Sequence, residues 1–226
     1  MIDYKFVESQ VDKILGKDSS GHSTEHVLTV VNNAKQILDN LTEECNADIV
    51  LLACYLHDVD DYKLVGEEQA ETLSNTRNIL SMLDISEDDK SKVIQIIENM
   101  GYSKLLKGVR PTTIEGMVVS DADMLDGGAN GVIRCLEFGF SKSRKVFDVN
   151  IMPVLDMDAA TYRTIESPSI NHFFEKLLLI KDVMMTSHGK KMAQKRHNIM
   201  IQFLENFFEE RHEDCSQWLE LLNKYK

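Results

Sequence analysis

Apolar residues recur every three or four positions through most of this chain, and that spacing is the feature that most limits its fold. It is clear over residues 6–15 and again over 27–41. Such spacing places the apolar side chains on one face of an α-helix. Residues 112–119 alone are rich enough in β-branched side chains to suggest a strand, and they continue into DADMLD in a way more typical of a helix. The sequence therefore predicts an all-α fold in a single domain.

Local signals place several boundaries within this helical pattern. Ser86 and Asp89 form a capping-box pattern at the start of a helix. Gly189 is expected to break the long segment 169–210 into two helices near residues 186–187. Two of the three prolines fall in 139–168, which predicts a long loop or insertion that could serve as a lid. Trp218 lies in a short apolar segment that could pack on the body of the protein or on another subunit, and we expect the body.

Composition restricts the function classes. With 226 residues the chain can bury one substantial core, and its net charge of −12 argues against stable nucleic-acid binding, which needs a basic surface. A phosphate site would therefore have to be a local basic pocket. No apolar run approaches the roughly 20 residues that span a bilayer, and the segment MIDYKFVESQVDK carries charges where a signal peptide is apolar. We expect a cytoplasmic protein that does not bind membranes. Its four scattered cysteines are expected to be buried small apolar residues rather than disulfide partners or zinc ligands.

Side chains that bind metal ions concentrate in three places. The segment GHSTEH contains His22 and His26, which are four residues apart and so share a helix face. His57 and Asp58 end the apolar segment DIVLLACYLHD, and Asp121 begins DADMLD. A pair of adjacent residues can point toward one ion only if the helix ends or bends there, and the polar residues that follow Asp58 fit such an end.

Each of these places alone has an ordinary explanation. A single histidine on an amphipathic helix is usually a surface or core residue, and an Asp-rich turn is usually a solvated cap. In combination, two histidines and two aspartates suit a hard or borderline divalent ion and leave positions for water and substrate oxygens.

The order H…HD…D resembles the HD superfamily of metal-dependent phosphohydrolases. The blocks GHSTEHVLTVVNNA, LHDVDDYKL, IEGMVVSDADMLD, GVIRCLEFG and FFEKLLLIKDVMMTSHGKKMAQKRHNIMIQFLENFF resemble those of a small bacterial subfamily. One branch of it is similar to manganese-dependent nucleotide pyrophosphohydrolases, which split nucleoside triphosphates into monophosphate and pyrophosphate. The resemblance implies an HD-type helical bundle over residues 1–210, followed by a C-terminal helical extension over 211–226.

The resemblance also implies a set of metal ligands. Carried onto this sequence, these are His26, His57, Asp58 and Asp121. The implied cofactor is one divalent ion, Mn²⁺ first, with Mg²⁺, Fe²⁺, Co²⁺ and Ni²⁺ as alternatives. The ion would lower the pKa of a water molecule and offset the charge that grows on the phosphoryl group.

Acidic residues near these ligands take different implied roles. Asp61 lies three residues after Asp58 and is the candidate general acid or base, acting beside the His57–Asp58 pair. Asp60 is expected to be a solvated neighbour. Asp126 resembles a second acid of the family, with an implied structural or indirect role.

Basic side chains are the candidate phosphate contacts. They are His22, Arg134, Lys176, Lys181 and Arg196, and His197 follows in the same block. A guanidinium group can hold two phosphate oxygens with parallel hydrogen bonds. The alternative for each is a surface side chain whose stem lies on apolar neighbours.

Three residues depart from the subfamily pattern. Thr29 stands where an arginine is usual, Met100 lies where a histidine is frequent, and Met124 replaces the arginine of DAD-R-LD. All three remove polar groups near the expected pocket, so the resemblance defines the reaction class better than the substrate.

The sequence thus predicts a metal-dependent phosphohydrolase that acts on a small phosphorylated molecule, with a nucleotide as the first expectation. One alternative is a catalytically weak sensor module that keeps its metal. A second is a metal oxygenase, which would need further ligands, and His22 is the spare histidine near these blocks. A monomer and a homodimer both remain open.

Overall fold

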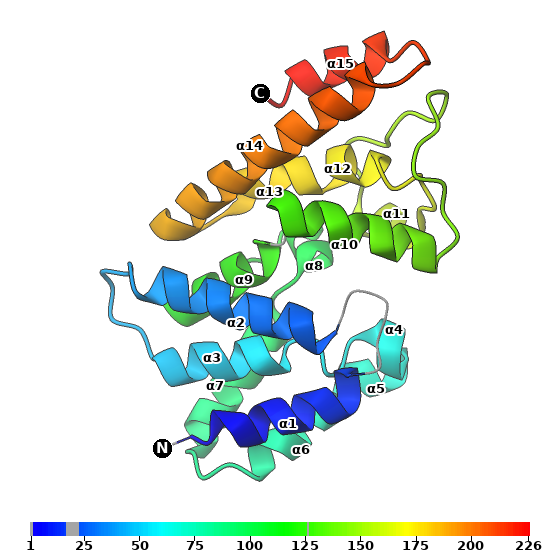
Figure 1. The fold of residues 1–226 in the computed structure, drawn as a ribbon. Coiled ribbons are helices and arrows are strands. Elements are labelled where there is room, and N and C mark those ends of the chain that lie inside the picture. Colours follow the sequence, from blue (N-terminus) through cyan, green and yellow to red (C-terminus); the bar gives the residue numbers. More distant parts are fainter. Residues whose placement is uncertain (1, 17–22, 126) are drawn as a thin grey trace. The chain divides into compact units, whose positions relative to one another are not determined.

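The computed structural model describes residues 2–16, 23–125 and 127–226. These residues form helices joined by turns and include no strand (Figure 1), so the all-α prediction is confirmed. None of the described helices is long and apolar enough to cross a membrane. The chain divides into two compact units, Met1–Asp123 and Met124–Lys226.

The first unit consists of nine helices within the described residues. They are α1 (Tyr4–Leu15), α2 (Thr24–Leu38), α3 (Ala47–Leu56), α4 (Tyr62–Val65), α5 (Glu67–Thr72), α6 (Ser74–Ser81), α7 (Glu87–Glu98), α8 (Tyr102–Leu106) and α9 (Ile114–Met124), the last of which ends one residue beyond the unit.

Helix α3 is the centre of the first unit. Seven of its ten residues are buried, from Ile49 to Leu56. It packs against α1, α2 and α7, and α2 and α3 lie side by side in Figure 1. Asn46 caps its first turn by accepting from the N–H groups of Asp48 and Ile49. These contacts bury the side chains of α3 as far as Leu56, the residue immediately before the His57–Asp58 pair.

Two predicted features of the first unit are confirmed. Ser86 caps α7 by accepting from the N–H of Asp89, and its hydroxyl donates to the Asp89 carboxylate at 2.8 Å. Residues 114–124 form helix α9 rather than a strand.

The second unit is organised around one long helix. Its elements are α10 (Gly128–Ser141), α11 (Ala159–Thr164), α12 (Asn171–Glu175), the 3₁₀ turn η1 (Leu177–Leu179), α13 (Ile180–Val183), α14 (Ser187–Glu209) and α15 (Ser216–Asn223). Helix α14 packs against α10, α13 and α15. Trp218 of α15 is fully buried, and its indole N–H donates to the Val149 carbonyl at 3.0 Å, so its expected packing on the body is confirmed.

The break near residues 186–187 occurs as predicted, although its cause differs, and the residues before it form α12, η1 and α13 rather than the single helix that we expected. Thr186 caps α14 by accepting from the N–H of Gly189, which therefore lies inside the first turn of the helix.

The predicted long loop over 139–168 is only partly irregular. Residues 142–158 form no regular element, whereas α10 continues to Ser141 and α11 lies within the expected loop. A Cβ atom at Gly139 would collide with Ser169, so glycine allows this close approach. The lid role of 139–168 stays a prediction.

Candidate metal centre

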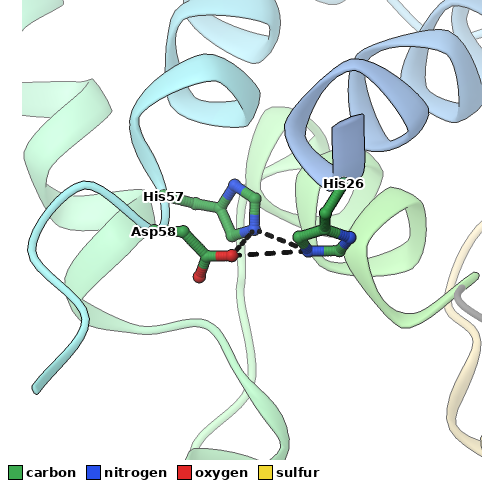
Figure 2. Close-up of side chains that lie close together, drawn as sticks. All are labelled: His26, His57 and Asp58. Carbon is green, nitrogen blue, oxygen red and sulfur yellow. Dashed lines mark hydrogen bonds and ion pairs between the residues drawn. The ribbon is translucent and has the colours of Figure 1, made fainter. Parts of the chain in front are cut away.

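His26 lies in the first turn of α2 and is buried, with 5% of its surface exposed. The start of α2 is fixed to α1 by the Thr24 hydroxyl, which donates to the Asp12 carboxylate at 2.9 Å. This contact joins α1 to the first turn of α2, which carries the His26 imidazole. Its Nε2 atom faces the end of α3 (Figure 2).

The chain turns sharply where α3 ends, as the adjacent His57–Asp58 pair requires. The helix ends at Leu56, and the Val59 N–H bonds to the Leu56 carbonyl in a tighter turn. The Nδ1 atom of His57 lies 2.9 Å from the Cys54 carbonyl. Because a carbonyl can only accept, Nδ1 must carry the proton, and Nε2 is the atom presented to the site.

Three donor atoms from α2 and the end of α3 gather at one point (Figure 2). The two histidine Nε2 atoms lie 3.3 Å apart. One oxygen of Asp58 lies 3.4 Å from the His26 Nε2 and 3.1 Å from the His57 Nε2. These three residues form a group that could hold a metal ion.

A fourth donor comes from α9. The Oδ1 atom of Asp123 lies 3.6 Å from the His26 Nε2 and 3.7 Å from the His57 Nε2. An ion with bonds of about 2.1 Å separates neighbouring ligands by about 3.0 Å in an octahedron and about 3.4 Å in a tetrahedron. The separation of the two histidine Nε2 atoms, and the distances from each of them to the Asp58 and Asp123 oxygens, range from 3.1 to 3.7 Å and are close to both values. The residues present therefore fit a divalent ion.

The family resemblance implied Asp121, and not Asp123, as the fourth metal ligand. Asp121 is also buried, with 1% of its surface exposed. Successive residues of an α-helix are rotated by about 100°, so residues 121 and 123 leave α9 about 200° apart. The distances favour Asp123, and coordination by Asp121 stays a prediction. The two acids cannot be distinguished from the sequence, because the distinction depends on how α9 is rotated about its own axis.

Charges within the cluster shift the pKa values of its members. Burial alone would lower the pKa of His57, but the neighbouring carboxylates of Asp58 and Asp123 raise it to about 9. Burial alone would raise the pKa of Asp123, but the hydrogen bond to His26 and the charge of His57 hold it below the usual value. The arrangement thus favours positive charge at its centre, as a cation site requires.

Asp60 does not lie in solvent, and our expectation of a solvated neighbour is wrong. Only 5% of its surface is exposed. Its two carboxylate oxygens accept from the backbone N–H groups of Asn75 at 3.0 Å and Thr76 at 2.8 Å, in the first turn of α6. The Asn75 amide donates in return to the Val59 carbonyl at 2.9 Å. Asp60 therefore fixes the turn that follows Asp58.

Asp61 is half-buried in the same turn, and its N–H donates to the Asp58 carbonyl at 3.1 Å. It thus lies close in the chain to the donor cluster, and its acid–base role stays a prediction. His22 and Asp126 lie outside the described residues.

The other candidate phosphate contacts belong to the second unit. Lys176 lies over the Tyr162 ring, and the Lys181 Nζ is 3.8 Å from an Asp182 oxygen. Arg134 and Arg196 are half-buried. His197 is buried, and its Nε2 lies 2.8 Å from the Tyr225 carbonyl, which ties α14 to the C-terminal residues. Phosphate binding by Arg134, Lys176, Lys181 and Arg196 stays a prediction.

The three residues that depart from the subfamily pattern make contacts within the fold or are buried in it. The Thr29 hydroxyl donates to the Glu25 carbonyl one turn earlier in α2, at 3.0 Å. Met100 and Met124 are buried, with 9% and 3% of their surfaces exposed.

Comparison with known proteins gives one family and several full-length relatives. Residues 24–128 match the HD domain model. The chain is 32% identical over 202 residues to the uncharacterized protein YpgQ of Bacillus subtilis, with 88% of each chain covered. It is 34% identical to an HD-superfamily hydrolase of known crystal structure from Bacillus thuringiensis, with a TM-score of 0.67, covering 92% of this chain and 96% of that one. A crystal structure of YpgQ in complex with ADP matches with a TM-score of 0.68 and 28% identity, covering 93% of this chain and 98% of that one.

Proposed function

Because this chain belongs to the HD superfamily of hydrolases, we propose that it is a metal-dependent phosphohydrolase acting on a small phosphorylated molecule. The observation that carries the proposal is the donor group of His26, His57 and Asp58, together with the Asp123 oxygen that lies within 3.7 Å of both histidine Nε2 atoms. Two imidazoles and two carboxylates suit Mn²⁺ and related divalent ions.

When bound, the ion would lower the pKa of a water molecule and offset negative charge on the phosphoryl group. The protein's own residues would do the rest. The Nδ1–H bond to Cys54 keeps the His57 ring in one orientation and one tautomer. Asp61, three residues after Asp58, is proposed to accept the proton of the attacking water, and the Asp60 contacts with α6 hold the turn that carries it.

A nucleotide is the proposed substrate class. The support is indirect: YpgQ has been crystallised in complex with ADP. This chain carries candidate cations for phosphate oxygens at Arg134, Lys176, Lys181 and Arg196, with His22 as a further candidate. Since the net charge is −12, such binding would depend on these local cations rather than on the field of the whole protein.

The test is release of phosphate and pyrophosphate from nucleoside triphosphates, diphosphates, monophosphates and sugar phosphates. Each reaction would contain Mn²⁺, Mg²⁺, Co²⁺ or a chelator. We expect turnover that needs metal, that is lost in Asp58→Ala and that is unchanged in Asp84→Ala, which alters an exposed aspartate outside the donor cluster. Release of pyrophosphate from a nucleoside triphosphate would show that the anhydride bond between the α- and β-phosphates is cleaved.

Equal turnover of the wild type and Asp58→Ala would contradict the proposal. Metal binding without turnover of any of these substrates would also contradict it, and would favour a sensor module that keeps its metal.

A further inference from the structure

Asn33 is a buried polar side chain away from the donor cluster that the proposed function does not use. It lies on α2 with 1% of its surface exposed. In α2, all of which the structure describes, the other buried residues besides His26 are apolar. An amide removed from water is costly unless its hydrogen bonds are made. A buried amide at this position is therefore expected to hydrogen-bond within the fold.

The backbone of α9 provides a partner for this amide. The Asn33 Nδ2 donates to the Ala122 carbonyl at 2.9 Å, and the two residues are 89 positions apart in the chain. Ala122 lies in the last turn of α9, between the two buried or half-buried acids of DADMLD. Carbonyl groups in the last turn of a helix lack the N–H partners that earlier turns provide. The Asn33 amide therefore supplies a cap to the end of α9 from another helix.

Asn33 and His26 share one face of α2. They are seven residues apart, which is about two turns and leaves a difference in direction of only about 20°. Helix α2 thus meets α9 at two points, the Asn33 amide on the Ala122 carbonyl and the His26 Nε2 at 3.6 Å from the Asp123 Oδ1. Two contacts from one helix fix both the position of the end of α9 along its axis and its rotation about that axis.

We propose that Asn33 is a positioning residue that sets the carboxylate of Asp123 in the metal centre. It acts through the peptide that precedes Asp123 and does not itself bind the ion. Loss of its amide would let the end of α9 turn or slide, and the Asp123 oxygen would leave its place beside the two histidines. The inference rests on the proposed metal centre but not on turnover.

The test uses Asn33→Leu, which removes the donor at similar size without adding charge. Asn32→Leu is the matched control, since Asn32 is exposed on the same helix. Affinity for Mn²⁺ and Co²⁺ would be measured by titration calorimetry, with the visible spectrum of bound Co²⁺ as a second readout. We expect Asn33→Leu to weaken metal binding by roughly 10- to 100-fold, as is usual for residues that orient ligands, and Asn32→Leu to change it less than about twofold.

A double-mutant cycle separates positioning from general loss of structure. If Asn33 acts through Asp123, Asn33→Leu should cost little further affinity in an Asp123→Asn background, yet should keep its full effect in an Asp58→Asn background. A purely structural role would give the same loss in both backgrounds and would overturn the inference. So would wild-type metal affinity in folded Asn33→Leu. If that variant does not fold, Asn33→Ser, which is too short to reach the carbonyl, takes its place in the cycle.

These outcomes stay distinct from those of the proposed function. A wild-type protein that binds Mn²⁺ but turns over no phosphate compound would refute the hydrolase proposal and leave the Asn33 cycle fully interpretable.

Discussion

Replacement of Asp60 by alanine should destabilise the first unit, because it removes the acceptor for two backbone N–H groups of α6. The helix has no local substitute: its N-cap residue is Leu73, whose side chain cannot accept and whose φ is 48°. Asp60 is thus the cap, supplied from 15 residues earlier in the chain. A leucine held in the left-handed region is unfavourable in itself, so the contacts of Asp60 offset some of that cost.

The size of the effect follows from burial of the two donors. A hydrogen bond to a charged group contributes about 1.5–3 kcal/mol, and a buried donor left unpaired costs about 1–3 kcal/mol. The Thr76 bond is buried, whereas the Asn75 bond is part-buried, so water can replace the second acceptor more easily. We therefore expect Asp60→Ala to lower the free energy of unfolding by about 2–4 kcal/mol, a large part of the 5–15 kcal/mol typical of a domain.

The assay is urea unfolding of the metal-free protein, followed by circular dichroism, with Asp84→Ala as the control at an exposed position. Asp60→Asn keeps one acceptor oxygen and should lose about half as much stability. Because the same turn carries Asp58 and Asp61, we also expect weaker Mn²⁺ binding in Asp60→Ala. A loss below about 0.5 kcal/mol, the range of ordinary surface substitutions, would refute the claim that Asp60 caps α6.

Two further predictions concern the fourth metal ligand and a buried acid of the second unit. Asp123→Asn should weaken Mn²⁺ binding in calorimetry far more than Asp121→Asn, because the Asp123 Oδ1 lies within 3.7 Å of both histidine Nε2 atoms. The reverse order would restore the sequence-based choice of Asp121. Glu175 accepts from the Ser167 hydroxyl at 2.7 Å, yet burial raises its pKa above the usual value. As pH falls, Glu175 therefore takes up its proton at a higher pH in the folded state than in the unfolded state. The free energy of unfolding of the wild type should then increase, relative to that of Glu175→Gln, as the pH is lowered from 7 to 4. A flat or opposite difference in urea unfolding would show that burial does not govern this carboxyl group.

Much of this fold could be predicted because its signals are local. The apolar spacing of α1 and α2, the capping box of α7 and the break at Thr186 each depend on residues within one or two turns of one another. The end of α3 after Leu56 followed from the need to point two adjacent side chains at one ion. These features need no knowledge of which helices are neighbours.

Asp60 shows why other features were missed. Three acids follow His57 within four residues, and in the sequence nothing separates the one that caps a helix from those near the metal. The distinction depends on α6, which begins at Ser74. A carboxylate that is solvated in isolation becomes buried because a distant helix start, left without a side-chain cap of its own, lies against it.

The choice between Asp121 and Asp123 depends on a rotation that no local pattern specifies. In DADMLD either acid could face the histidines, and a turn of about 200° along α9 would exchange them. The rotation is fixed by long-range contacts, among them the bond from Asn33 to the carbonyl of the intervening Ala122. A residue of α2 that looks like one more polar position in VVNNAK thereby helps to decide which acid reaches the site. The metal centre is therefore specified jointly by its donors, which the motif H…HD…D makes visible, and by a buried amide on the same helix face as His26, which the motif does not include.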